Sequence, residues 1–547
     1  MKIFRILIVL ASFSSLGANS LADRLITKDG NVIEVEKARQ LQDGTYELTF
    51  KAGTIICPED EIREIEIEGD MSDYVPKNEN EKRKLEQGFV RYDGKWLSAQ
   101  RYKNLLRDRA EERRVRLEEI EHHSEFKNAY EKLTKHFHIR TNTTPELLEY
   151  YAELLEAYYR LMDKRVGIKP TPSLRRTKMK VNIYRTREDW EEENEIGTGG
   201  GVVGYFSPHQ QTLNFFYDSE DPSFTDWVAL HECTHLLTYL IDPQAHARIW
   251  INEGVADFFG SSDIVRDKKG KLKILPGKIQ VDRILTVQQA IKEDKYTRLE
   301  KLFKIDRGTF NAFHYAHAWS FVYFLNNHSK YEKGFRKFFK LNYTLPKSVD
   351  FKWEGTTKVV PAKEVRRLLL ESIKVKDVQK LEDEWLTFIK SIDVSAPEAL
   401  FKRAYINYRQ GKSEEYEQAF ADLNEAIEGG VETSRAYATR GSIRLVVKDG
   451  GGVDGAVKDY RRAVELDPLE AGYRINLGLL MSGQLVLLPG LDVRGQIMPK
   501  GAKGKVREEA IMHMGLAIEL EPDNSFYSSL FESFKKNDRE GGSDKAQ

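Results

Sequence analysis

The sequence predicts an α+β protein made of a small β domain, a mixed domain with a short sheet and many helices, and an α-helical repeat domain. Short runs of alternating apolar residues follow the N-terminus, and apolar residues at three- and four-residue spacing dominate the middle of the chain. One helical pattern recurs toward the C-terminus. The chain has 547 residues, which is more than one hydrophobic core usually serves.

The first 22 residues have the pattern of a secretory signal peptide. Residues 1–5 are short and basic, an apolar stretch follows, and Ser20-Leu21-Ala22 forms a small-x-small cleavage site. The stretch is too short to stay as a membrane span, and no later apolar run approaches about 18 residues. We therefore expect an exported protein, periplasmic or secreted, that is cleaved near Ala22 and does not insert stably in a membrane.

Composition argues against several classes of partner and of fold. The 85 basic and 86 acidic residues nearly cancel, giving a net charge of -1, so nothing points to a nucleic-acid partner. Two cysteines, Cys57 and Cys233, are too few for a disulfide scaffold. They fall in different predicted domains, and we expect both to be free.

Residues 23–68 are predicted to form the small β domain. The alternating runs LITK, VIEVE, YELTF and TIIC are punctuated by Asp29-Gly30 and Asp43-Gly44, which are hairpin turn signals. Residues 69–122 are predicted to be a charged linker with a hairpin at 88–98 and a solvated helix from 99. This charged region is also a candidate inhibitory segment.

Residues 123–395 form the predicted mixed domain. Strands are expected at 136–142, 178–184 and 211–217, and helices at 145–167, at 187–194 and around residue 230. Gly199, Gly201 and Gly204 spell GxGxxG, but a charged helix precedes this motif and Pro208 follows it. A dinucleotide site needs a strand before the glycines and a helix after them. We expect a mobile glycine loop leading to an exposed strand instead.

Residues 396–535 contain an imperfect repeat with small residues at fixed helical spacing. The segment at 419–430 recurs 37 residues later, and a third copy begins at Ala510 after an insert. The pattern resembles tetratricopeptide repeats, whose period is about 34 residues and whose concave faces bind partners. The resemblance implies a protein partner on these repeats, and a disordered tail is expected at 536–547. The recurring residues are Ala419, Asp422 and Ala426, then Ala456, Asp459 and Ala463.

The stretch LHECTHLLTYL at 230–240 holds two histidines four residues apart. On a helix, four residues rotate by about 40° net and rise about 6 Å, so His231 and His235 project from one face. One ion can bridge them, and zinc favours such nitrogen ligands. Glu232 lies one position round the helix, where it suits a base beside the ion. The alternative is a core helix with two hydrogen-bonded histidines.

A third ligand is predicted from the segment RIWINEGVADFFG at 248–260. Glu253 follows His235 by 18 residues on a second apolar helix, and Asp257 shares its helix face. A ligating histidine usually donates its other N–H to a carboxylate, and Asp257 is the candidate for that bond. Packing alone gives little reason for two carboxylates on an otherwise apolar helix, so the pattern favours a metal site.

HECTH followed by NEGVADFFG resembles the gluzincins, the thermolysin-like zinc metallopeptidases. The resemblance implies that His231, His235 and Glu253 bind Zn²⁺, that Glu232 is the general base, and that Asp257 supports a ligating histidine. Within that clan, 125–340 is most similar to an uncharacterised exported bacterial family of peptidase-MA-like domains that often carry tetratricopeptide repeats. The gap between the second histidine and the glutamate is slightly shorter than in thermolysin, and the rest of that enzyme is not recognisable.

The same resemblance implies two further features of a zincin-like domain. Gluzincins use a tyrosine or histidine to stabilise the oxyanion, and 310–325 supplies Tyr315, with His314 and His317 as alternatives. The segment GYFSPHQQTLNFF is expected to supply an edge strand that pairs with the substrate backbone.

Three functions remain open from the sequence. The first is an exported zinc-dependent peptidase that acts on a peptide or protein substrate through metal-activated water and Glu232. The second is a protein-binding scaffold whose repeats recruit a partner and whose zinc domain is vestigial. The third is a metal-dependent hydrolase of a different substrate, which metal ligands alone do not exclude.

Overall fold

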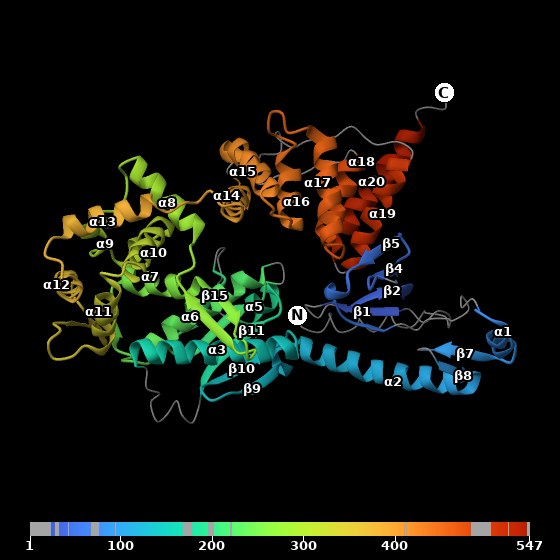
Figure 1. The fold of residues 1–547 in the computed structure, drawn as a ribbon, viewed down its shortest axis with the longest axis horizontal. Coiled ribbons are helices and arrows are strands. Elements are labelled where there is room, and N and C mark those ends of the chain that lie inside the picture. Colours follow the sequence, from blue (N-terminus) through green and yellow to red (C-terminus); the bar gives the residue numbers. More distant parts are fainter. Residues whose placement is uncertain are drawn as a thin grey trace, which may run out of the picture. The chain divides into compact units, whose positions relative to one another are not determined.

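The computed structural model describes residues 23–27, 32–41, 43–66, 76–92, 95–167, 178–194, 202–218, 221–409, 411, 413–482, 505–522 and 524–543. It has the predicted α+β character, with several small sheets and a helical C-terminal region. The chain divides into two compact units (Figure 1). One is Arg114–Ile406, and the other combines Met1–Arg113 with Asn407–Gln547.

A five-stranded sheet lies in the unit Arg114–Ile406. The strand order is β12-β13-β11-β10-β9. The three inner strands are parallel, while β9 and β12 pair antiparallel at the two edges. The three strands predicted from sequence are confirmed, and β12 is an edge strand as expected. The strands are β9 Tyr130–Leu133, β10 Phe137–Thr141, β11 Met179–Tyr184, β12 Gly204–Ser207 and β13 Thr212–Phe216.

Helices α3 (Pro145–Val166) and α6 (Pro222–Tyr239) pack on one face of this sheet in a single hydrophobic core. The boundaries of α3 follow from its sequence, because the Thr144 side chain caps the N-terminus and Gly167 ends it in the left-handed region at φ 76°. The other elements of the unit are η3 Phe126–Asn128, α5 Arg187–Glu193, β14 Ala245–His246, α7 Ile249–Gly260, β15 Ser262–Arg266, β16 Leu272–Pro276, α8 Val281–Lys292, α9 Leu299–Leu302, η4 Arg307–Thr309, α10 Ala312–Asn327, α11 Glu332–Thr344, β17 Lys352–Glu354, β18 Thr357–Val359, α12 Ala362–Ile373 and α13 Val378–Lys390.

The second unit contains two small three-stranded sheets, β2-β1-β6 and β3-β4-β5. The predicted turn at Asp43-Gly44 is present, with Gly44 at φ 91° and the Asp43 carboxylate accepting the Thr45 N–H. Strands β3 and β6 were not predicted. The elements before α2 are β1 Asp23–Thr27, β2 Val32–Val35, β3 Lys37–Gln40, β4 Tyr46–Thr49, β5 Thr54–Cys57, η1 Glu59–Glu61, β6 Ile62–Glu66, α1 Glu79–Glu86, β7 Phe89–Tyr92 and β8 Lys95–Ser98. The long helix α2 spans Ala99–Ser124.

The C-terminal helices carry the recurring alanines of the repeat in buried positions. Ala419, Ala456 and Ala510 are all fully buried, because a small side chain lets neighbouring helices approach closely. The predicted tail at 536–547 begins inside the last helix, which continues to Ser543, so its first part is helical rather than disordered. The helices are α14 Pro397–Arg409, η5 Ser413–Glu415, α15 Tyr416–Glu428, α16 Ser434–Ile443, α17 Gly452–Leu466, α18 Ala471–Ser482, α19 Lys505–Leu520 and α20 Ser525–Ser543.

The N-terminal sheets and the last helices share one hydrophobic core. Leu25, Leu48 and Ile55 pack with Leu479 and Met514, among others, in a single buried cluster. In addition, one carboxylate on α19, that of Glu519, accepts the backbone N–H groups of Lys51 and Ala52 at 3.0 and 2.7 Å. The sequence predicted two separate domains here. A β domain this small cannot bury enough apolar surface alone, and the helices supply the missing partner.

Other expectations differ from the structure or fall outside it. The linker predicted to start at residue 69 contains α1, because Asn78 caps a short helix there. Within the described residues, none of the helices is both long and apolar enough to cross a membrane. The predicted signal peptide, Asp29-Gly30, Gly199, Gly201 and the insert before Ala510 all lie outside the described residues, apart from the last few positions of that insert.

We predict that Gly254→Ala destabilises the unit Arg114–Ile406. A Cβ at Gly254 on α7 would lie 2.8 Å from the backbone oxygen of Ala318 on α10, so the helices would have to separate. Overpacking of this kind costs about 1–3 kcal/mol, measured as a lowered midpoint of urea unfolding. Gly308→Ala is the control, because a Cβ there meets nothing within 4 Å. Equal midpoints for the two variants would contradict close packing at Gly254.

Candidate metal centre

Helix α6 brings the two predicted histidines together. Asp221 caps its first turn through the Phe224 N–H, and the helix runs without interruption through His231 and His235. Their Nε2 atoms face one another at 3.2 Å. The geometry expected from the four-residue spacing is therefore present.

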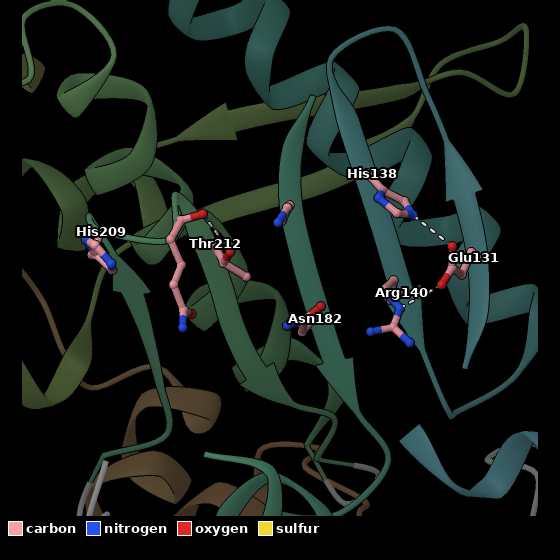
Figure 2. Close-up of a pocket in the computed structure, with 8 residues that line it drawn as sticks. Glu131, His138, Arg140, Asn182, His209 and Thr212 are labelled. Atoms are coloured by element: carbon pink, nitrogen blue, oxygen red, sulfur yellow. Dashed lines mark hydrogen bonds and ion pairs between the residues drawn. The ribbon is translucent and has the colours of Figure 1, made fainter. Parts of the chain in front are cut away.

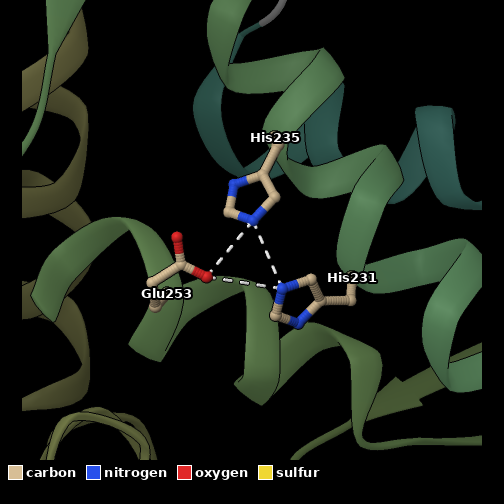
Figure 3. Close-up of side chains that lie close together, drawn as sticks. All are labelled: His231, His235 and Glu253. Atoms are coloured by element: carbon tan, nitrogen blue, oxygen red, sulfur yellow. Dashed lines mark hydrogen bonds and ion pairs between the residues drawn. The ribbon is translucent and has the colours of Figure 1, made fainter. Parts of the chain in front are cut away.

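Helix α7 supplies the third group from the opposite side (Figure 3). The Glu253 Oε2 atom lies 3.5 Å from Nε2 of His231 and 3.5 Å from Nε2 of His235. Ligand atoms at about 2.0–2.1 Å from one tetrahedral ion lie about 3.3–3.4 Å apart, so these separations fit three corners of such a site. Glu253 and His231 are buried and His235 is mostly buried. The group can hold a metal ion.

Asp257 holds His231 in position, and it is held in turn by α8. One Asp257 oxygen lies 3.0 Å from His231 Nδ1, and the other lies 3.0 Å from Nη2 of Arg283. The Gln280 side chain donates to the Asp257 backbone oxygen at 3.1 Å. Asp257 is fully buried, so loss of either partner would leave a buried polar group without compensation. The structure thus brings Asp257 to the position expected of it.

The charges around the histidines favour a cation. Burial opposes a charge on His231, but hydrogen bonds to Asp257 and Glu253 raise its pKa to about 10. Burial likewise opposes a charge on Glu253, yet the two histidines hold its pKa well below the usual range. The field at this point therefore stabilises positive charge, as a metal site requires.

Glu232 lies on α6 beside the ligand group and is anchored to the edge strand. One of its carboxylate oxygens, Oε2, accepts the backbone N–H of Phe206 on β12 at 3.0 Å. Burial raises the pKa of Glu232, against the opposing effect of His231 and His235. The other oxygen, Oε1, accepts no hydrogen bond among the described residues.

The structure brings Tyr315 to the ligand group. Burial raises the pKa of Tyr315, and the charges of Glu253 and Asp257 and a hydrogen bond to Glu253 raise it further. The Arg283 guanidinium lies over its ring, 5.6 Å from the centroid. The Tyr315 hydroxyl therefore stays protonated at neutral pH, beside one of the three possible ligands.

The two alternatives to Tyr315 take part in contacts within their own helix. His314 forms a capping box with Asn311 at the start of α10. His317 is fully buried, its Nδ1 lies 2.7 Å from the Phe313 backbone oxygen, and burial lowers its pKa to about 4. Each of these histidines therefore has a structural contact within its own helix, and neither contact involves the metal group.

Sequence reasoning missed two arginines at this site. Arg283 is one, and Arg307 is the other, with Nη2 3.5 Å from Oε1 of Glu253 and a side chain that is 79% exposed. Neither lies in a motif, since each reaches the site from a separate segment of the chain. No local spacing indicates such a contact.

The two cysteines form no disulfide, as predicted, and both are buried. Cys233 lies on α6 between the two histidines, and burial raises the pKa of its thiol. It is not one of the three groups that converge, so its role is packing.

Fold and site together define an α+β protein with a buried His-His-Glu group that can hold a metal ion. Residues 228–344 match a family described as "Protein of unknown function (DUF1570)". The matched segment includes His231, His235, Glu253, Asp257 and Tyr315. No curated protein matches the chain.

We predict that Arg283→Met weakens metal binding. Without the guanidinium, buried Asp257 loses a charge partner and His231 loses its orientation. Removing such supporting contacts typically lowers metal affinity about 10–100-fold, measured by competition with a chromophoric zinc chelator. Arg266→Met is a matched control, because Arg266 is exposed and contacts Glu153 and the Gly270 backbone oxygen rather than the metal group. Unchanged affinity in a folded Arg283→Met protein would show that Asp257 needs no support from α8.

Proposed function

We propose that this protein is an exported zinc-dependent peptidase of the gluzincin type. His231, His235 and Glu253 would hold the zinc ion. The observation that carries the proposal is the convergence of two Nε2 atoms and one carboxylate oxygen at 3.2 and 3.5 Å, with Glu232 beside them on the same helix.

The donor set favours zinc among divalent ions. Two imidazole nitrogens and one carboxylate oxygen, near tetrahedral spacing and with a fourth position left for water, are typical of catalytic zinc sites. Magnesium and calcium prefer sites made of oxygen ligands. When bound, zinc supplies a Lewis acid that polarises a carbonyl group and lowers the pKa of water to about 7.

Glu232 acts as the general base in this proposal. Its Oε2 atom is fixed by the Phe206 N–H, which leaves Oε1 to accept a proton from the attacking water. The protonated carboxyl then donates to the nitrogen of the leaving amine, so the proton is conserved through the reaction. The Phe206 hydrogen bond holds the carboxylate in one orientation for both transfers.

Tyr315 donates its hydroxyl hydrogen bond to the oxyanion. Its raised pKa keeps the hydroxyl protonated at neutral pH, as a donor must be. Such a donor stabilises charge that develops only in the transition state. The contact with Glu253 places the hydroxyl at the ligand group before substrate arrives.

An extended peptide is the substrate that best fits the edge strand. β12 lies at the edge of the sheet, and an exposed edge can accept another strand through backbone hydrogen bonds. The same strand anchors Glu232. One strand, β12, would therefore position both the substrate backbone and the general base.

The scaffold hypothesis is the second candidate, with a protein partner on the C-terminal repeats. A vestigial zinc domain would have no use for a carboxylate anchored beside the ligand group. The Glu232–Phe206 bond therefore favours the peptidase over the scaffold.

We predict that Glu232→Gln strongly slows cleavage of unfolded casein and leaves metal content unchanged. The amide keeps the shape and accepts no proton, so the rate should fall about 10²–10⁴-fold. Gel-based cleavage assays and elemental analysis of zinc test the two parts separately. If the purified parent holds zinc and cleaves no unfolded protein, the proposal that it acts broadly on peptides is wrong. If the variant cleaves as fast as the parent, Glu232 is not the base.

We predict that Tyr315→Phe lowers kcat by about 10²–10³-fold, the usual loss for one oxyanion donor, with little change in KM. Zinc content should remain that of the parent. Tyr323→Phe is the matched control, because Tyr323 lies on the same helix and stacks on Trp319. A loss of kcat in His314→Ala, with Tyr315→Phe unaffected, would transfer the role to the histidine.

A further inference from the structure

The face of the five-stranded sheet that lies opposite α3 and α6 contains a hollow of about 650 Å³ (Figure 2). Strand alternation creates this face, because Phe137 and Ile139 of β10 point into the core while His138 and Arg140 point away from it. The hollow extends across β9, β10, β11 and the β12–β13 turn. It lies on the other side of the sheet from the metal group.

Basic side chains dominate the lining. Arg140, Lys180, His138 and His209 all line the hollow, against one carboxylate, Glu131, among the described lining residues. Both Glu131 oxygens are already engaged, one by Arg140 Nε at 2.8 Å and the other by His138 Nε2 at 3.0 Å. Glu131 therefore holds Arg140 and His138 and does not pair with Lys180.

Arg140 is held rigidly at the edge of the hollow. Beyond its bond to Glu131, its Nη2 donates to the Phe126 backbone oxygen at 3.1 Å, and its guanidinium lies over the Phe126 ring, 5.0 Å from the centroid. Nη1 has no hydrogen-bond acceptor among the described residues. A preorganised guanidinium loses little freedom when it binds an anion.

Lys180 stands in the middle of the hollow. It pairs in register with His138 of β10 and with Thr212 of β13, so all three side chains are cross-strand neighbours. No carboxylate within the described ranges forms an ion pair with its ammonium group. The side chains of His209 and Gln210, on the turn beside it, likewise have no hydrogen-bond partner among the residues described.

A solvated sheet face is the simplest alternative explanation. Parallel strands, however, are usually covered on both faces, and β10, β11 and β13 are parallel. This hollow lies open over parallel strands. It is lined by the fixed guanidinium of Arg140 and, among the described residues, by the unpaired ammonium group of Lys180, which a random polar surface would not be expected to combine. Its volume also falls in the range of small-ligand sites, about 300–1,000 Å³.

We propose that this hollow binds a phosphate group, free or as a small phosphate monoester, through Arg140 and Lys180. A tetrahedral dianion can accept hydrogen bonds from several directions at once, and these two donors come from the neighbouring strands β10 and β11. The hollow is larger than one phosphate ion. The remaining space, lined by the amides of Asn182 and Gln210, suits a small polar group attached to it.

The test is isothermal titration calorimetry of the full mature chain with inorganic phosphate and, separately, with glycerol 3-phosphate, at constant ionic strength. Saturable binding is expected for the parent. Lys180→Glu should weaken it at least about tenfold, as expected for loss of a hydrogen bond to a charged group. Lys273→Glu, the same charge change on an exposed lysine of β16, should alter affinity less than about twofold. Tighter binding of the monoester than of free phosphate would identify the ester as the ligand, and equal binding would identify phosphate itself.

Three outcomes would overturn the proposal. They are no saturable binding of either probe, equal weakening by Lys180→Glu and Lys273→Glu, and phosphate binding that survives in Lys180→Glu. The last would place the phosphate at the metal group instead. Lys180 is exposed, so the variant should fold, and an unchanged circular dichroism spectrum confirms this before titration.

Discussion

The metal group depends on how α7 is fixed between α6 and α10. The absence of a side chain at Gly254 lets α7 approach the backbone of α10, and Glu253, the residue before it, then faces the histidines of α6. A ligand set drawn from two helices holds its geometry only if the helices cannot slide. Close packing of α7 is therefore what turns three separate side chains into one site.

A buried chain of charges completes that site. His231, Asp257 and Arg283 form a chain of contacts across three helices, and the Asp257 carboxylate lies between the imidazole and the guanidinium in a place with little water. Such a chain is costly if any member is removed, because the remaining charges stay buried. Through this chain, α8, which carries no metal ligand, also helps to fix the orientation of the His231 imidazole.

The sequence predicted the parts of this site that depend on local spacing. His231 and His235 on one helix, and Glu253 and Asp257 on another, follow from helical periodicity alone. The three parallel strands of the central sheet follow from their apolar pattern, whereas β9 was not predicted. Arg283 and Arg307 were not predicted, because their contacts join segments with no shared pattern. The common core of the N-terminal sheets and the last helices was missed for the same reason, since only tertiary packing reveals it.

The common core of the N-terminal sheets and the last helices also affects when this unit can fold during synthesis. The strands that hold Leu25 and Leu48 leave the ribosome early, whereas Leu479 and Met514, which cover them, are made more than 400 residues later. Contacts of such long range are slow to form, so the apolar face of the early strands must stay uncovered until the chain is nearly complete. A chain that crosses a membrane unfolded and closes this core only afterwards would avoid that exposure in the cytoplasm, and a truncated one would keep an aggregation-prone surface.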